Sequence, residues 1–400
     1  MNIFSKGFYR LIHFSFYLIK PLLPYKPPKV LNEISEIVGV LTKKHINNVM
    51  LVSDKMVREI GLTKELESLL KDANINLVIY DEVKPNPTSE NVEKGVKLYK
   101  EKKCKALIAF GGGSPIDCAK AIAARIAKPK KTLRQLKGIL KVGKKIPTLF
   151  CIPTTAGTGS ETTITSVISD SFTHEKYTIN DFNLVPEYAV LDPTVTFTLP
   201  KHLTSTTGLD ALTHAVEAYI GKSTSKTTRK QSIEAIKLIF ANIEKAYNYP
   251  TDYEARKNML IASNLAGKAF SMSYVGYVHA VAHTLGGKYN VPHGLANSIL
   301  LPIFLKEYGK SIYKKLWKIS VALNFVSKES SYVDGYNAFI KKLDELNDAL
   351  NIPKNVSKIE VSDIPAMAKT AAKEANHIYP VPTMKSAKEL EKFYYIAKGE

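Results

Sequence analysis

The sequence predicts two domains of different class, an α/β domain with a parallel sheet followed by an all-α domain. Apolar, strand-like runs alternate with helical patterns up to about residue 200, and this alternation is typical of a parallel sheet covered by helices. Beyond that point we find helical patterns alone. A chain of 400 residues also exceeds what one hydrophobic core usually organises. We therefore expect an N-terminal extension at 1–30, an α/β domain at 31–200 and a helical domain at 201–400.

Short apolar runs are the strand candidates of the α/β domain. Helical patterns separate them, as expected where a helix connects two parallel strands. The predicted strands are residues 48–53, 76–80, 105–110 and 148–152, and the predicted helices include residues 90–102 and 116–126.

Long stretches with helical periodicity follow the predicted join at Leu199-Pro200. Their apolar residues recur every three or four positions, which favours amphipathic helices. The predicted helices are residues 210–219, 228–247, 253–270, 303–323, 335–350 and 363–376.

The chain carries 56 Lys and Arg against 37 Asp and Glu, a formal net charge of +19. Such an excess can reflect nucleic-acid binding, in which clustered cations neutralise phosphates. Here the lysines are scattered and we find no nucleic-acid motif, so we expect a lysine-rich enzyme surface and no nucleic-acid partner. Cys104, Cys118 and Cys151 are dispersed without C-x-x-C spacing, which favours a cytoplasmic protein over a disulfide scaffold.

The first thirty residues are basic and aromatic, with five cations and no acid. Their longest uncharged stretch, residues 11–19, is too short to span a bilayer, and no A-x-A cleavage pattern follows it. Two interpretations stay open. The segment forms a helix that lies on a membrane surface, or it packs on the enzyme or on a partner subunit, which we favour slightly.

A glycine-rich turn follows the third predicted strand. Gly111-Gly112-Gly113-Ser114-Pro115 leads into a helical pattern, and glycines let a backbone approach a phosphate closely. Pro115 suits the first turn of a helix, whose free N–H groups and dipole favour an anion. The turn does not match G-x-G-x-x-G, and a tight strand-to-helix connection without a ligand is the alternative. Its position at the carboxyl end of a strand favours the phosphate interpretation.

Two further features suit a dinucleotide. Residues 153–161, after the fourth predicted strand, are rich in hydroxyls and glycine, although a polar loop without a ligand would have the same composition. Asp54 closes the first strand, where a carboxylate can accept hydrogen bonds from ribose hydroxyls and repel a 2′-phosphate. It would then favour NAD over NADP. A helix N-cap explains Asp54 equally well.

A group of histidines and one aspartate predicts a metal site. Asp210 and His214 are four residues apart on a helical pattern, so their side chains share one face. His279, His283 and His293 lie within fifteen residues of one another. Mixed oxygen and nitrogen ligands suit Fe²⁺ or Zn²⁺. The spacing leaves five candidate residues for about four ligand positions and does not show which of the five is not a ligand.

These motifs together resemble the iron-containing alcohol dehydrogenase family. The resemblance rests on residues 111–117, residues 153–161, Asp210 to His214 and the block from His279 to Gly294, in that order and at that spacing. It covers the chain from about residue 35 to near 390. It implies the dehydroquinate synthase-like fold of that family, with a dinucleotide in the α/β domain and a metal in the helical domain.

The resemblance also implies roles for individual residues. The metal ligands fall on Asp210, His214, His279 and His293, and His283 falls on a catalytic histidine that does not ligate the metal. Phe270 falls on an aromatic residue near the substrate, although the following residues, 271–275, depart from the family's usual pattern. The dinucleotide contacts fall on Asp54, Asn86, Gly112, Gly113, Ser114, Asp117, Thr154, Thr155, Thr158, Thr163 and Lys176.

The implied function is hydride transfer between NAD and an alcohol or aldehyde, with Fe²⁺ or Zn²⁺ as the metal and a homodimer as the assembly. Within the same fold, the alternatives are a polyol-phosphate dehydrogenase and a lyase similar to dehydroquinate synthase. A membrane-associated scaffold without activity is the alternative from another class, and the intact set of ligand candidates argues against it.

Overall fold

The computed structural model describes residues 3–19, 23–173 and 175–400, and it divides into two compact units. The α/β unit comprises Pro24–Leu199. The helical unit comprises Pro200–Glu400 together with the N-terminal helix α1 (Ile3–Ile19). Residues 1–2 and 20–22 of the predicted N-terminal extension lie outside the described residues.

A parallel sheet forms the core of the α/β unit. Within the described residues it has six strands in the order β1-β9-β6-β4-β2-β3, and all their pairings are parallel. The strands are β1 (Lys29–Leu31), β2 (Asn48–Val52), β3 (Asn76–Tyr80), β4 (Ala106–Gly111), β6 (Thr148–Pro153) and β9 (Tyr188–Val190).

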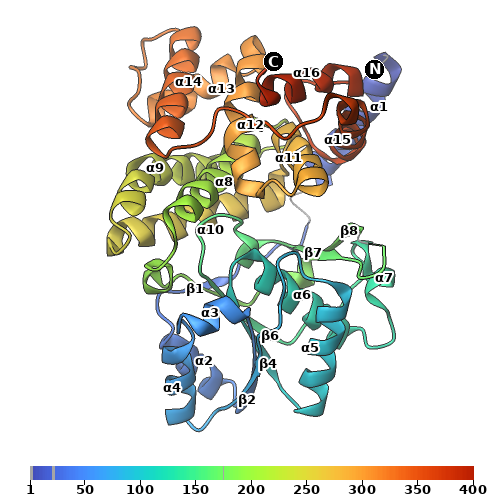
Figure 1. The fold of residues 1–400 in the computed structure, drawn as a ribbon, viewed down its shortest axis with the longest axis vertical. Helices are drawn as coiled ribbons and strands as arrows, with labels where there is room; N and C mark the ends of the chain where they lie inside the picture. The colour runs from blue at the N-terminus through green and yellow to red at the C-terminus, as the bar shows by residue number, and fades with distance from the viewer. Residues whose placement is uncertain (1–2, 20–22, 174) are drawn as a thin grey trace. The chain divides into compact units, whose positions relative to one another are not determined.

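Helices cover both faces of this sheet (Figure 1). On the central strand β4, Leu107 and Ala109 join the apolar core under α5 (Ser89–Glu101) and α6 (Gly113–Ala127). Ile108 and Phe110 join the opposite core, which also contains residues of α2 (Glu36–Lys43) and α4 (Lys64–Asp72). Because alternate residues of a strand point to opposite faces, a strand between two cores must be apolar throughout. This explains why the sequence reveals the central strands as unbroken apolar runs.

A second, smaller sheet was not predicted. It has the order β5-β8-β7, and β7 (Thr165–Ser169) pairs antiparallel with β8 (Lys176–Asn180). β5 (Gly138–Ile139) pairs with β8. The exposed faces of β7 and β8 carry Thr, Ser and Lys, so the segment has the composition of a polar loop.

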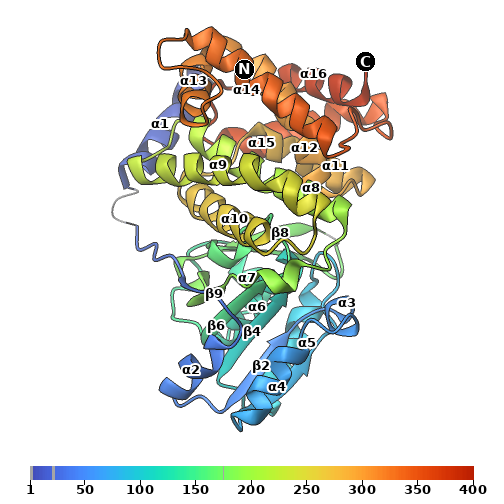
Figure 2. The same cartoon turned by 90° about the vertical axis from the view of Figure 1, so that its left-hand side faces the viewer.

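The helical unit is built around α8 (Lys201–Ile220), which is buried on all sides over most of its length. It packs against α9 (Lys226–Asn248), α10 (Tyr253–Ser273) and α12 (His293–Tyr308). Figure 2 shows α8, α9 and α10 side by side. The other long helices are α11 (Tyr277–Tyr289), α13 (Tyr313–Ala322), α14 (Tyr332–Ala349), α15 (Ile364–Ile378) and α16 (Ala387–Lys398).

The prediction of one helix over residues 303–323 was wrong. α12 ends at Tyr308, where Gly309 adopts a φ of +44°, and α13 starts at Tyr313. Glycine tolerates a positive φ because it has no Cβ, and a residue in that conformation ends a helix. The apolar periodicity continues across the break, which is why the sequence pattern concealed it.

The helix α1 packs on the helical unit through its polar side. Arg10 donates from its two guanidinium nitrogens to the carbonyls of Val381 and Pro382, at 2.8 and 3.0 Å, and His13 is buried. No helix within the described residues is long and apolar enough to cross a membrane.

Candidate metal centre and dinucleotide loops

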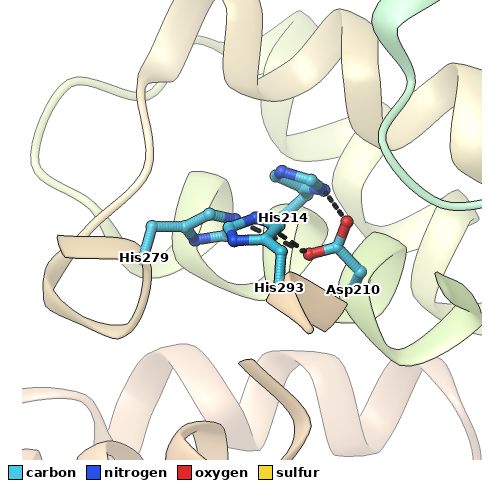
Figure 3. Close-up of side chains that lie close together, drawn as sticks. All are labelled: Asp210, His214, His279 and His293. Carbon is cyan, nitrogen blue, oxygen red and sulfur yellow. Dashed lines mark ion pairs between the residues drawn. The ribbon is translucent and has the colours of Figure 1, made fainter. Parts of the chain in front are cut away.

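The four predicted metal ligands come together in the helical unit (Figure 3). Asp210 and His214 project from α8, His279 from α11, and His293 is the first residue of α12. One ligand atom from each side chain lies within 4.8 Å of all the others. Around the carboxylate, His293 Nε2 is 3.5 Å, His279 Nε2 is 4.0 Å and His214 Nδ1 is 3.9 Å from the nearer oxygen.

The state of His279 shows that the cluster fits a cation. Its Nε2 is buried and has no hydrogen-bond partner among the residues that the structure describes. Burial, reinforced by the nearby His214 and His293, holds its pKa well below the usual value, so the ring is neutral at pH 7. A buried nitrogen without a partner is costly, and a neutral imidazole is the form that ligates metals. Three imidazole nitrogens and one carboxylate form a ligand set that suits Fe²⁺ or Zn²⁺.

Two neighbours that the sequence did not reveal hold these side chains. The Asn297 amide donates to Asp210 Oδ1 at 2.6 Å, and the same nitrogen lies 3.2 Å from His293 Nε2. Glu217 Oε2 lies 2.6 Å from His279 Nδ1. Burial raises the pKa of Glu217 to about 7, although backbone N–H groups act against this. A usable signal was present, because Asp210, His214 and Glu217 follow one another at helical spacing on α8.

Gly294 allows α12 to approach α8. A Cβ at this position would overlap the carbonyl of Thr206 and would lie 3.4 Å from the Cβ of Asp210. The close approach places His293 beside Asp210. A side chain at position 294 would push these two helices apart.

Gly294→Ala is therefore expected to destabilise the protein by about 1–3 kcal/mol, the usual cost of overpacking. We also expect metal binding to weaken about tenfold, as it does when the support of a ligand is disturbed. Gly287→Ala is the matched control, because a Cβ there meets nothing within 4 Å and helical alanine stabilises by about 0.5–1 kcal/mol. Thermal unfolding and zinc titration of both variants measure the contrast. Equal behaviour of the two would contradict this account of Gly294.

The structure places His283 beside the cluster, outside the four residues that converge. Its Nδ1 lies 2.8 Å from Glu374 Oε1, and its ring stacks on that of His293 at 5.3 Å. Tyr379 donates to the same Glu374 oxygen at 2.6 Å. Burial alone would raise the pKa of Glu374, but the charge of His283 and the hydrogen bonds from His283 and Tyr379 lower it overall. The His283 side chain is 44% exposed, so the ring can exchange protons with solvent.

The predicted substrate residue Phe270 packs against His214, one of the candidate metal ligands. Its ring stacks on His214 with centroids 4.2 Å apart and an angle of 16°. Tyr274, in the segment that departs from the family pattern, adopts a φ of +63° after the last residue of α10. A bulky residue in this conformation is strained, and such strain concentrates near functional sites.

In the α/β unit, the predicted dinucleotide residues gather around the first turn of α6. Gly112 caps this helix, and a Cβ on Gly112 or Gly113 would contact Thr155 or Thr158, at 3.6 and 3.2 Å. The backbone N–H of Thr154 donates to the carbonyl of Gly111 at 3.1 Å. The two loops therefore lie against each other at the carboxyl ends of β4 and β6, where α/β sheets bind their ligands.

Three other predicted residues form a small hydrogen-bonded group beside this turn. The backbone N–H of Asn86 donates to Ser114 Oγ at 3.2 Å, and Lys176 Nζ donates to Asn86 Oδ1 at 2.8 Å. Their polar atoms come from three separate segments of the α/β unit. This convergence agrees with a shared ligand.

Three of the predicted contact residues also have structural partners. Asp54 caps α3 (Lys55–Glu59) by accepting from the backbone N–H of Val57 at 2.9 Å. Asp117 accepts from Ser160 Oγ at 2.7 Å. The Thr163 hydroxyl lies 2.8 Å from Nζ of the buried Lys120, a residue that the sequence did not single out. Part of the hydrogen-bonding capacity of these three side chains is thus used within the fold.

Comparison with known proteins identifies the family. The profile of the iron-containing alcohol dehydrogenases matches residues 28–193, and the profile of that family's C-terminal domain matches residues 204–396. Alcohol dehydrogenase 4 of Saccharomyces cerevisiae is 36% identical over 348 residues, 86% of this chain and 90% of that protein. The 1,3-propanediol dehydrogenase of Citrobacter freundii is 34% identical over 382 residues, 94% of this chain and 97% of that protein.

Solved structures agree with this assignment. The crystal structure of a 1,3-propanediol oxidoreductase has a TM-score of 0.89 at 33% identity, with 93% of this chain and 99% of that chain covered. The alcohol dehydrogenase from Oenococcus oeni has a TM-score of 0.88 at 30% identity, with coverage of 93% and 100%. The chain therefore belongs to the iron-containing alcohol dehydrogenase family and is an oxidoreductase of that family.

Proposed function

We propose that this enzyme interconverts small primary alcohols and aldehydes, with NAD as the preferred dinucleotide and Fe²⁺ or Zn²⁺ held by Asp210, His214, His279 and His293. The observation that carries the proposal is the convergence of these four side chains around His279 Nε2, which is buried and has no hydrogen-bond partner in the described part of the chain. Family membership supports a metal and a NAD-type cofactor. The names of the relatives, an alcohol dehydrogenase and a 1,3-propanediol dehydrogenase, support the substrate class.

The chemistry divides between the bound groups and the chain. When bound, the metal supplies Lewis acidity toward the alcohol oxygen, and the nicotinamide takes up the hydride. Oxidation of an alcohol by NAD also releases one proton, and we assign its acceptance to His283. Glu374 Oε1, 2.8 Å from Nδ1, orients the His283 ring, and Nε2 is the nitrogen to which we assign acceptance of this proton and its transfer to water. Phe270 offers an apolar surface for the carbon chain beside His214.

A metal-reconstituted activity screen tests this function. The metal-free enzyme, reloaded with Fe²⁺ or Zn²⁺, is assayed with NAD(H) and NADP(H) across straight-chain alcohols, diols, polyol phosphates and aldehydes. We expect metal-dependent turnover of NADH with short aldehydes. Activity confined to polyol phosphates, or no net turnover of NADH as for a lyase, would contradict the proposal.

Asp54 provides a test of the preference for NAD. Asp54→Asn keeps the helix cap, because Asn and Asp cap equally well, but it removes the charge that would repel a 2′-phosphate. We expect the ratio of kcat/KM for NADPH to that for NADH to rise about tenfold, equivalent to about 1.4 kcal/mol, with thermal stability unchanged. An unchanged ratio would show that Asp54 acts as a cap alone.

We further propose that α1 contacts an anionic membrane surface. While Arg10 and His13 face the protein, Phe8, Leu11 and Leu18 are 62%, 64% and 58% exposed. These three residues share one side of the helix, since they are spaced by three and seven positions. The first thirty residues contain no acid, so an anionic lipid surface complements both their apolar and their basic side chains.

Co-sedimentation with vesicles tests this contact. The full chain is expected to bind vesicles rich in phosphatidylserine, and the double variant Leu11→Ser, Leu18→Ser is expected to lose most of this binding. Phe172→Ser is the control, because Phe172 is 92% exposed on the other unit. If the double variant and the control bind equally, α1 has no membrane role.

We also propose that the protein is a homodimer and that the fraction not bound to membranes is cytoplasmic. Light scattering of the same samples tests the homodimer, and cell fractionation tests the location.

A further inference from the structure

Glu217 is a buried carboxylate at the centre of the helical unit. It lies on α8, three residues beyond His214, and is 3% exposed. Its Oε2 accepts from the backbone N–H of Gly276 at 2.8 Å, and its Oε1 accepts from that of Val278 at 3.0 Å. Its Oε2 also lies 2.6 Å from His279 Nδ1. The carboxylate thus binds the first turn of α11 and the imidazole that the same turn carries.

The backbone at Gly276 lies close against this carboxylate. A Cβ at position 276 would lie 2.5 Å from Glu217 Oε1 and 3.0 Å from its Cδ, so glycine is required for the chain to wrap this closely. The contact therefore fixes the His279 ring relative to both α8 and α11. Nε2, on the far side of the ring, faces Asp210 Oδ1 at 4.0 Å.

We propose that Glu217 is a positioning residue for His279, which it holds in the tautomer with the proton on Nδ1. A neutral imidazole has one N–H, so a proton fixed on Nδ1 leaves the Nε2 lone pair for a metal ion. Two backbone N–H groups already donate to this carboxylate, at 2.8 and 3.0 Å, and an N–H on His279 Nδ1 is the third donor that its two oxygens can accept. Carboxylates that orient ligand histidines commonly set metal affinity. The inference rests on the proposed metal centre and adds to it a residue outside the ligand set.

The chemistry of an amide predicts what Glu217→Gln would do. Three N–H groups converge on two carboxylate oxygens, whereas glutamine offers one oxygen and an NH₂ group that donates. The variant must therefore either lose a backbone cap of α11 or present NH₂ to His279 Nδ1. In the second case the proton moves to Nε2 and blocks the ligand atom. We expect metal affinity to fall about 10–100-fold.

Gly276→Ala offers an independent way to disturb the same contact. Its Cβ would displace the Glu217 carboxylate without removing its charge. Metal affinity should again fall, and the double variant should lose less than the sum of the two single effects, because both act on one contact. Glu374→Gln is the matched control. It alters a similar carboxylate contact, 2.8 Å long, but to His283, which is not a proposed ligand.

The experiment titrates the metal-free proteins with Zn²⁺ in competition with a chromophoric chelator, and circular dichroism checks each fold. The inference predicts weaker binding for Glu217→Gln and Gly276→Ala and wild-type binding for Glu374→Gln. A folded Glu217→Gln or Gly276→Ala variant with wild-type affinity would overturn it. If the wild-type protein itself binds no Zn²⁺, the proposed metal centre fails, which is a distinct outcome.

A measurement on the unaltered chain covers the case in which neither variant folds. Nitrogen NMR of the metal-free protein, labelled with ¹⁵N in its histidines, reports which ring nitrogen carries the proton. The His279 signals are assigned by their absence in His279→Ala. We expect the Nδ1–H tautomer, and the Nε2–H tautomer would overturn the role assigned to Glu217.

Discussion

Replacing His279 with alanine is expected to remove the bound metal and to lower kcat/KM by about a thousandfold or more. The side chain contributes one of four converging ligand atoms, and Glu217 holds its ring in place. A catalytic metal contributes several kcal/mol of transition-state stabilisation, and about 4 kcal/mol corresponds to a thousandfold change in rate. Elemental analysis and steady-state kinetics on the purified variant measure both effects.

His283→Ala is the matched control for this prediction. It alters a histidine one helical turn away that the structure places outside the converging four. We expect it to keep its metal and to lose about 10²–10⁴-fold in kcat, the usual contribution of general acid–base catalysis. A folded His279→Ala enzyme with wild-type metal content and turnover would contradict the ligand assignment.

Lys120→Met is expected to lower the stability of the α/β unit more than any other substitution proposed for this unit. Lys120 is fully buried, and its ammonium donates to the carbonyls of Ser160, Thr163 and Thr165 at 2.5, 2.8 and 3.0 Å. It therefore ties α6 to the loop that follows β6. Methionine has a similar shape but no donor, so these carbonyls would lose their partner at a cost of about 1–3 kcal/mol each.

Allowing for relaxation, we expect a loss of about 3–5 kcal/mol in the free energy of unfolding of the α/β unit, or about 10 °C in its Tm. Weaker NADH binding should accompany this loss, because Thr163 and Asp117 lie on the same hydrogen-bonded network. Lys97→Met is the control, since that side chain is 76% exposed and its ion pair with Glu101 contributes little. Differential scanning calorimetry compares the two variants. Similar Tm values would show that Lys120 does not stabilise this loop.

The sequence predicts those parts of the fold whose burial is uniform. The strand at residues 76–80 has the predicted bounds, and those at 48–53, 105–110 and 148–152 are correct to within one residue at either end. Buried parallel strands are apolar throughout, which makes them easy to recognise. The β7–β8 hairpin is half exposed and polar, so it resembles a loop. The break at Gly309 depends on one backbone angle that apolar periodicity does not record.

In the candidate site, too, the sequence predicts local relations within one helix but not the contacts between helices. Spacing predicts that Asp210 and His214 share a face of one helix, but it leaves His279, His283 and His293 equivalent. The structure separates them because Glu217 holds one ring toward the cluster, whereas Glu374, ninety-one residues away from His283, holds another at its edge. Contacts of this kind depend on how helices pack. The orientation of α1 is a further example, since the side chain of Arg10 faces the protein to reach backbone carbonyls near residue 381.

The central claim is that Asp210, His214, His279 and His293 hold the catalytic metal. Anomalous X-ray diffraction from crystals of the enzyme loaded with Fe²⁺ or Zn²⁺ tests it most directly. We predict a single strong peak in the helical unit, about 2.0–2.2 Å from one oxygen of Asp210 and one nitrogen of each histidine. A fully loaded, active enzyme whose metal peak lies elsewhere, or lacks any one of these four ligands, would contradict the account.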